Sequence, residues 1–163
     1  MHCPGCTLFS HDIVVLLIVL CLNGYMFDHC LYFNSASLAR LVEREWTAAY
    51  AAFDLTPAQG FVLRVVLAKP GCLGSEVADV LGISRPTATR LIDNLCVKEL
   101  VTRRRAETDG REWQLEPTES GKLIGDPLNQ ASARIAKSLR QRIGSTLFDA
   151  TVTDIRAVRE SLE

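Results

Sequence analysis

The sequence lacks the features on which most enzymes depend. It has only three histidines, His2, His11 and His29, and all of them lie near the beginning of the chain. It has no glycine-rich loop of the kind that holds phosphates, and no cluster of histidine and cysteine with metal-ligand spacing. Acidic residues on the helical segments are read more simply as solvated helix faces. We therefore expect no catalytic site, no cofactor and no bound metal.

An overall excess of positive charge is also missing, because the 163 residues carry a net charge of −1. The basic residues are nevertheless concentrated in one segment. Between Ser84 and Arg111, seven arginine and lysine residues stand against four acidic ones. This local excess predicts one positive face on an otherwise acidic protein, a distribution that suits a nucleic-acid partner.

The first 25 residues contain no segment long enough to cross a bilayer. The apolar run Ile13–Leu22 has the length of a signal-peptide core, but neither lysine nor arginine precedes it and no good cleavage site follows. The pair Cys3 and Cys6 has the spacing of redox and zinc sites, yet one pair alone is a weak signal. We interpret residues 1–25 as a disordered or mis-annotated extension, with translation starting at Met26. No membrane association is expected.

The six cysteines do not form a convincing extracellular disulfide framework. Two of them, Cys72 and Cys96, lie in a segment where a small buried hydrophobic residue is the simpler interpretation. A reducing compartment is therefore favoured, and we expect a cytoplasmic protein.

The segment Gly71–Lys98 organises the chain and has the spacing of a helix-turn-helix. Apolar residues at helical intervals predict two short helices, and Gly82 between them can adopt the positive φ of a tight turn. The apolar face of the second helix includes Leu91, so we expect Leu91→Ala to lower stability by about 2 to 5 kcal/mol. Its opposite face carries groups that can hydrogen-bond phosphates and base edges, which indicates DNA. This face comprises Arg85, Thr87, Thr89, Arg90 and Asn94.

Helices are predicted on both sides of this motif. One covers Cys30–Phe53, and the next starts with Thr56 as its N-cap and Pro57 in its first position. Beyond the motif, Leu100–Arg105 and Arg111–Pro117 read as the two strands of a hairpin, which would be the wing of a winged helix. Its three consecutive arginines, Arg103, Arg104 and Arg105, are expected to lie along phosphates.

Residues after Thr118 are again predicted to be helical. An apolar stripe runs from Leu123 to Ile143 with a kink near Pro127, and a capping signal at Thr151 predicts a last helix. These helices and Cys30–Phe53 extend too far from a small winged core to be buried by it. We expect a second copy of the chain to cover them.

Three stretches resemble the MarR family of bacterial transcriptional regulators. Residues 55–59 resemble the start of that family's second helix, and residues 84–95 resemble its recognition helix. Residues 109–111 resemble the Asp-x-Arg of its wing, and Thr118 with Gly121 resembles the Thr-x-x-Gly that opens its fifth helix. The chain departs from the family at Glu99, where the family has glycine at the end of the recognition helix.

The resemblance implies a mainly α-helical protein with a small β wing. Residues 55–118 would form the winged helix-turn-helix DNA-binding domain, and residues 26–54 and 119–163 a helical dimerisation region. A homodimer would bind a pseudo-palindromic operator as a repressor. The residues expected at the DNA are Ser84, Arg85, Pro86, Thr87, Thr89, Arg90, Asn94, Arg103, Arg104, Arg105, Asp109 and Arg111.

The resemblance further implies release from DNA by a signal. Family members respond to small phenolic or apolar ligands bound between the dimer helices and the winged domain, and a subset senses oxidants through a cysteine near the first helix. Cys30 lies near that position and is the candidate redox sensor, while the simpler interpretation is an ordinary buried cysteine. The alternative function is a winged-helix protein-interaction module without specific DNA binding.

Overall fold

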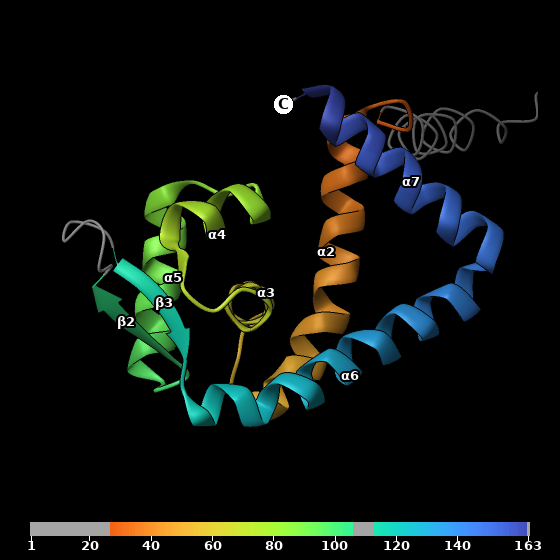
Figure 1. Cartoon of the computed structure of the whole chain (residues 1–163). Coiled ribbons are helices and arrows are strands. Elements are labelled where there is room, and N and C mark those ends of the chain that lie inside the picture. The colour runs from red at the N-terminus through yellow and green to blue at the C-terminus, as the bar shows by residue number, and fades with distance from the viewer. Residues whose placement is uncertain (1–26, 106–112, 163) are drawn as a thin grey trace, which may run out of the picture. The chain divides into compact units, whose positions relative to one another are not determined.

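The computed structural model describes residues 27–105 and 113–162, and the chain divides into two compact units, residues 1–43 and 44–163. Among the described residues the protein is mainly helical with one small sheet, as the sequence predicted (Figure 1). In chain order the elements are α2 (Leu31–Tyr50), the 3-10 helix η1 (Ala51–Phe53), α3 (Pro57–Ala68), β1 (Cys72–Leu73), α4 (Gly74–Leu81), α5 (Arg85–Val97), β2 (Val101–Arg105), β3 (Trp113–Pro117), α6 (Glu119–Ile143) and α7 (Ser145–Leu162).

Helix α3 begins where the sequence predicted. The Thr56 hydroxyl accepts the N–H of Gln59 at 3.3 Å, and the Gln59 side-chain oxygen accepts the N–H of Thr56 at 3.0 Å. This reciprocal capping box satisfies two backbone donors that the first turn leaves unpaired, and Pro57 has no N–H to satisfy. The start of α3 is thus fixed by local chemistry.

The helix-turn-helix consists of α4 and α5. Gly82 ends α4 in the left-handed region with φ of 61°, and the N–H of Ile83 returns to the carbonyl of Ala78 at 3.0 Å. A glycine accepts this φ without strain, because it has no Cβ to collide with the backbone. The predicted turn is confirmed.

The sheet has the order β1-β3-β2 and is antiparallel throughout. The β2–β3 pairing sets Arg103 opposite Leu115 and Arg105 opposite Trp113. These two strands are the predicted wing, and the tip between them, residues 106–112, lies outside the described part of the chain. The sequence analysis missed β1, because two residues are too few to show an alternating pattern.

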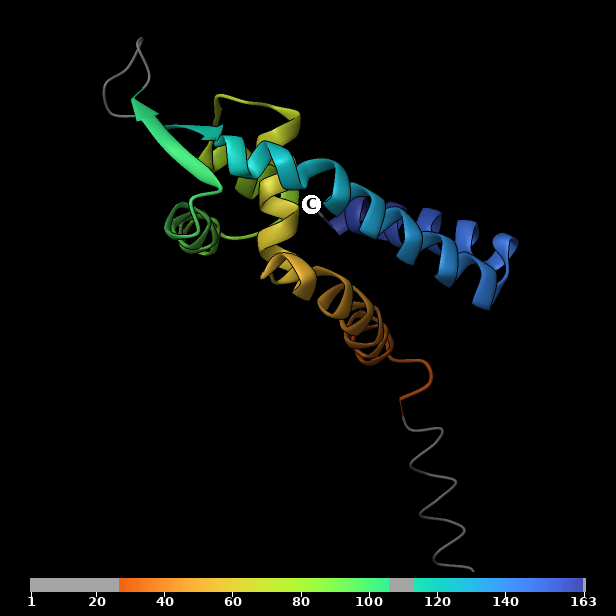
Figure 2. The same ribbon diagram turned by 90° about the horizontal axis from the view of Figure 1, so that it is seen from below.

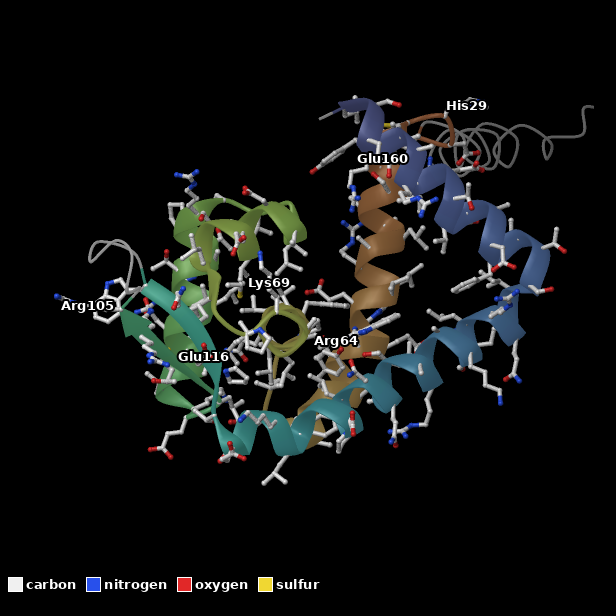
Figure 3. All side chains as sticks on the ribbon, in the orientation of Figure 1. His29, Arg64, Lys69, Arg105, Glu116 and Glu160 are labelled. Atoms are coloured by element: carbon white, nitrogen blue, oxygen red, sulfur yellow. The ribbon has the colours of Figure 1, made fainter. Side chains whose placement is uncertain are left out.

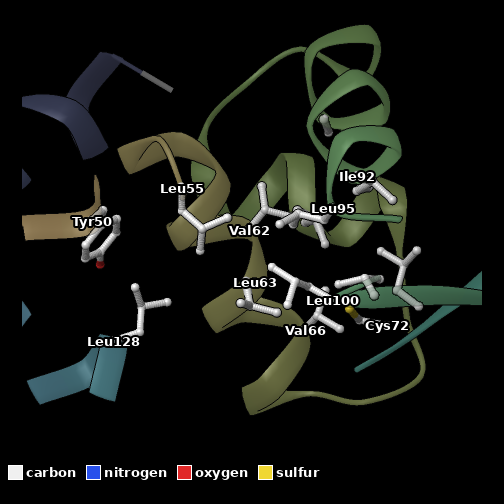
Figure 4. Packing of buried hydrophobic residues seen from close by; sticks show 14 of the residues in the cluster. Tyr50, Leu55, Val62, Leu63, Val66, Cys72, Ile92, Leu95, Leu100 and Leu128 are labelled. Carbon is white, nitrogen blue, oxygen red and sulfur yellow. The ribbon is translucent and has the colours of Figure 1, made fainter. Parts of the chain in front are cut away.

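The core is built around α3. Val62, Leu63 and Val66 are fully buried there, and Leu95 of α5 packs into the same cluster (Figure 4). Leu91 is partly buried and packs against the edge of this cluster, on the apolar side of α5 as predicted, so the stability loss expected for Leu91→Ala stays a prediction. Leu95 lies four residues further along, about 40° around the helix from Leu91, and is completely buried there.

A tight junction connects α5, the wing and α6. The Thr118 hydroxyl accepts the N–H of Gly121 at 3.0 Å and donates to the Glu99 carbonyl at 2.6 Å. A Cβ on Gly121 would lie 2.2 Å from the Leu100 carbonyl oxygen, so no other residue fits there without a backbone shift. Glu99 itself adopts φ of 57°, the left-handed conformation that the family's glycine would adopt. The departure at Glu99 therefore leaves the helix end in place.

The C-terminal part consists of two long helices that meet at Gly144 (Figure 2). Helix α6 runs through Pro127 without interruption. Helix α7 begins at Ser145, so the start predicted at Thr151 was wrong. The Thr153 hydroxyl instead donates to the Asp149 carbonyl at 2.9 Å, the bond that threonine makes inside a helix.

The expected apolar stripe of α6 is buried only in part. Leu128 is fully buried and Ile135 nearly so, whereas Leu123 is 77% exposed and Ile143 45% exposed. Helix α7 contains no buried residue at all. Within residues 27–105 and 113–162, no single helix has both the length and the apolar character needed to span a membrane. The segment 31–53, which contains α2 and η1, meets the length and hydropathy criteria only when it is combined with α3, and the two segments are bent by 67° relative to each other.

Candidate nucleic-acid interface

The N-terminal end of α5 is locked by its own polar side chains. Ser84 is the N-cap, and its oxygen accepts the N–H of Thr87 at 3.3 Å and lies 2.8 Å from the Thr87 hydroxyl. Pro86 lies in the first turn, where its missing N–H is harmless. Ser84 and Thr87, both predicted to face DNA, thus have a structural role whether or not DNA is bound.

The two faces of α5 differ in the way that the sequence predicted. Ala88, Ile92 and Leu95 are buried, whereas Arg85, Thr89, Arg90 and Asn94 are exposed. The Thr89 hydroxyl donates to the Arg85 carbonyl at 3.0 Å and keeps its lone pairs available. Within the described residues, neither the Arg85 nor the Arg90 side chain has a hydrogen bond or ion pair, so both guanidinium groups can bind an external acceptor.

The three consecutive arginines of the wing do not share one face. Side chains alternate along a strand, so Arg103 and Arg105 lie on the side of buried Val101, while Arg104 lies on the other side. The Arg103 guanidinium is 2.6 Å from the Asp93 carboxylate on α5, which ties the wing to the helix and offsets part of its charge. Arg103 is therefore tied to α5, Arg105 lies on the same side of the sheet as Arg103, and Arg104 lies on the opposite side. Asp109 and Arg111, the remaining predicted wing residues, lie outside the described residues.

Trp113 is an aromatic residue of this face that the sequence analysis did not select. It is 48% exposed, and the Arg105 guanidinium carbon lies 5.4 Å from its ring centroid. Figure 3 shows Arg105 at the outer end of the wing strands. Side chains two residues apart on a strand lie on the same face, so Trp113 shares the face of buried Leu115. The sequence could therefore have placed this ring on the same face as Arg105.

A hollow of about 350 Å³ lies between the wing, α5 and the start of α4. Trp113, Arg103 and Thr89 contribute to its walls, and Ser75 contributes a further hydroxyl. Its lining combines hydrogen-bond donors with apolar carbon, which suits a sugar-phosphate backbone. The full lining consists of Leu73, Gly74, Ser75, Thr89, Ile92, Arg103, Trp113 and Leu115.

A second, larger cavity of about 650 Å³ lies among α3, α4 and α6. Phe61, Val65 and Leu67 give it an apolar wall. Arg64, marked in Figure 3, gives it a cationic group whose Nε donates to the Asn129 side-chain oxygen at 2.8 Å. This combination of apolar walls and a few fixed polar groups is typical of small-molecule sites.

The cysteines that the structure describes have different surroundings. Cys30 is partly buried immediately before α2, and the N–H of Phe33 lies 3.5 Å from its sulfur. Burial raises the pKa of Cys72 and the pKa of Cys96, which disfavours the reactive thiolate. Among residues 27–105 and 113–162, no group of three or more potential metal ligands comes together. The pair Cys3 and Cys6 lies outside these ranges.

Comparison with known proteins agrees with this geometry. Residues 53–112 match the model of the MarR family. A solved structure of the transcriptional repressor CouR bound to a 23-mer DNA duplex is 26% identical, covers 83% of this chain and 96% of its own, and superposes with a TM-score of 0.77. No curated protein matches the chain.

Two further structures show the same fold at lower identity. The MepR–DNA complex from S. aureus is 19% identical over 80% of this chain and 97% of its own, with a TM-score of 0.73. PcaV from Streptomyces coelicolor, in complex with its natural ligand, is 23% identical over 77% of this chain and 92% of its own, with a TM-score of 0.67.

The fold and the exposed basic helix define a winged helix-turn-helix protein. The domain at residues 53–112 matches the model of the MarR family, and the fold is that of solved regulators of this kind. The resemblance noted in the sequence is thereby confirmed.

Proposed function

We propose that this chain is a DNA-binding repressor that acts as a homodimer on a pseudo-palindromic operator and is released by a small ligand. The observation that carries the proposal is the exposed face of α5, which presents Arg85, Thr89, Arg90 and Asn94 while the opposite face is buried. An α-helix fits the major groove of B-DNA, and arginine and asparagine are suited to bidentate contacts with guanine and adenine.

The wing supplies the second part of the DNA contact. Arg105 and Trp113 are exposed on the side of the sheet that faces α5, next to the hollow with Thr89 and Ser75. Donors at this position would hold the phosphate backbone while α5 reads bases, since phosphate contacts fix register and base contacts select sequence. The solved complexes of CouR and MepR with DNA support this arrangement for a chain of this fold.

Helix α7 supports the proposal of a homodimer. Its exposed apolar residues follow one another at mostly helical intervals, and none of its residues is buried. A face of this kind is stable in water when a partner covers it, and a second copy would also provide the second recognition helix for a symmetric operator. The residues are Leu147, Val152, Ile155, Val158 and Leu162, with exposures between 43% and 80%.

The cavity beside Arg64 supports the proposal of ligand release. Phe61 and Val65 suit a small phenolic or apolar molecule, and the cavity contacts α3, α4 and α6 together. A ligand that binds one arrangement of these helices better than another shifts the population toward it. PcaV has been solved with its natural ligand, a precedent for this mode of control. Oxidation of Cys30 is the alternative releasing signal.

The decisive experiment is fluorescence anisotropy with a duplex from the protein's own upstream region. We expect tight binding that weakens steeply as salt rises, and much weaker binding to a scrambled duplex of the same length. Blocked transcription from the same promoter in vitro would identify repression. Binding that is absent or insensitive to salt would instead favour a protein-interaction module.

Ligand and oxidant are separated in the same assay. Phenolic compounds added to the complex should release DNA from the wild type and from Cys30→Ser alike if the cavity is the sensor. Peroxide that releases only the wild type would assign the signal to Cys30.

A further inference from the structure

The C-terminal end of α5 is fastened at two points. One is the hydrogen bond from Thr118 to the Glu99 carbonyl at the start of α6. The other is Lys98, whose Nζ donates to the Asp54 carbonyl at 2.6 Å and also pairs with the Asp54 carboxylate. Asp54 directly follows η1, at the point where the chain leaves α2 and turns into α3. Lys98 thus joins the end of α5 to the connection between η1 and α3.

The Lys98 contact lies at the surface, with the Lys98 side chain 27% exposed and the Asp54 side chain 93% exposed. It differs from a pair within one helix because the two residues are 44 positions apart. The ammonium also satisfies a backbone carbonyl at a helix end, and Asp54 has φ of 54°, so the chain there is held in one sharply defined turn. By contrast, the Lys122–Glu119 pair links neighbouring turns of α6 and connects nothing else.

We propose that Lys98 is a positioning residue that sets the angle of α5 relative to the connection between η1 and α3, and through it the separation of the two recognition helices in the dimer. The inference rests on the proposed function, because it needs a dimer that binds two half-sites. Such half-sites lie about 34 to 36 Å apart, one helical turn of DNA. A small rotation of α5 at this contact would move a recognition helix relative to its groove, so the contact would fix the spacing without touching a base.

The test compares an intact operator with a duplex that contains one half-site, both derived from the upstream sequence footprinted by the wild type. Lys98→Met keeps the aliphatic stem and removes the ammonium. We expect its affinity for the intact operator to fall about 2- to 30-fold, the range for changes that act through a structural connection. Affinity for the half-site duplex should stay within about twofold, because one helix can adjust to one groove without a spacing constraint.

The matched control is Lys122→Met, which removes an exposed lysine of the same length and should leave both affinities unchanged. Lys98→Arg should restore most of the operator affinity, because a guanidinium can reach both the carbonyl and the carboxylate. Asp54→Asn keeps the carbonyl acceptor and tolerates positive φ, so its loss should be smaller than that of Lys98→Met. Thermal unfolding of each variant establishes that it is folded.

Two outcomes would overturn the inference. Equal loss on the intact operator and the half-site, with the salt slope reduced by about one, would show that Lys98 contacts a phosphate directly. No loss on either duplex would show that the contact does not position α5. A wild type that fails to bind its upstream DNA in a sequence-dependent way would contradict the proposed function instead, and that result is obtained before any variant is measured.

Discussion

The winged part of the molecule and helix α7 use their apolar residues in opposite ways. In the winged part, Leu63, Leu95 and Leu115 are buried against each other from three different elements, so this region encloses its own core. In α7, Val152 and Ile155 are each 53% exposed, and no residue of the helix is buried. One region is stabilised by its own core, while the other has an apolar face that no part of the described chain buries.

This difference suits the two tasks of the proposed function. Reading DNA needs a helix held rigidly in place, and the capped, core-packed α5 meets that need. The proposed dimer needs an apolar surface that is exposed in the single chain, and α7 has such a surface. Changes in the two regions should therefore give different phenotypes.

The largest expected effect is on the core. Leu95→Ala should lower the free energy of unfolding by about 2 to 5 kcal/mol, because it leaves a cavity where a fully buried side chain was packed. The matched change Leu123→Ala, at a leucine that is 77% exposed, should have little effect. Chemical denaturation at one fixed protein concentration measures both. Equal losses would contradict the assignment of the core.

The next largest effect is on assembly. Ile155→Glu should raise the dimer dissociation constant on the order of 100-fold, because it would bury an unpaired carboxylate in an apolar interface. Sedimentation equilibrium measures this directly. Val97→Glu changes an equally apolar residue that is 83% exposed on α5, and it should leave the dimer intact. Dissociation caused by Val97→Glu and not by Ile155→Glu would place the interface elsewhere.

An effect on DNA without an effect on folding is expected at Arg90. Arg90→Ala should weaken operator binding by about 1 to 3 kcal/mol if the guanidinium contacts a base, with the melting temperature unchanged. Arg134→Ala, which removes an exposed arginine from α6, should not change the affinity. A neutral Arg90→Ala would remove Arg90 from the proposed interface.

A gain of stability is expected at Glu99. Because Glu99 holds φ of 57°, Glu99→Gly should stabilise the protein by about 0.5 to 1 kcal/mol, the relief of strain exceeding the added entropy of the unfolded chain. Glu119→Gly, in the first turn of α6, should destabilise instead. Thermal and urea unfolding show whether each change raises or lowers the free energy of unfolding. A destabilised Glu99→Gly would contradict the argument.

The smallest effect concerns acid stability. The Lys69 ammonium and the N–H of Leu73 lower the pKa of Glu76 below its usual value. A lowered folded pKa contributes stability above the unfolded pKa of about 4.3, and that contribution is lost as the pH falls through the folded pKa. Glu76→Gln should therefore reduce the loss of stability below pH 4.5, measured as melting temperature against pH. Lys69→Met should reduce it partly, since the Leu73 bond remains.

Much of the winged part was predictable because its signals are local. The Thr56 and Gln59 capping box, the positive φ of Gly82 and the apolar spacing of α5 are each written within a few residues, and the structure has all three. The start of α7 was not predictable in this way, because Thr151 to Asp154 carry the same residue types whether they cap a helix or bond within one. The third strand, Cys72–Leu73, exists only through its pairing with Leu115 and Gln114.

The sequence by itself determined the fold class, the helix-turn-helix and the exposed face of α5, because helix periodicity, capping and turn chemistry are properties of adjacent residues. The tertiary structure alone decided which leucine of α5 fills the core, which wing arginine pairs with Asp93, and that Lys98 reaches Asp54. These contacts join residues far apart in the chain, and their partners are fixed only when the elements pack together.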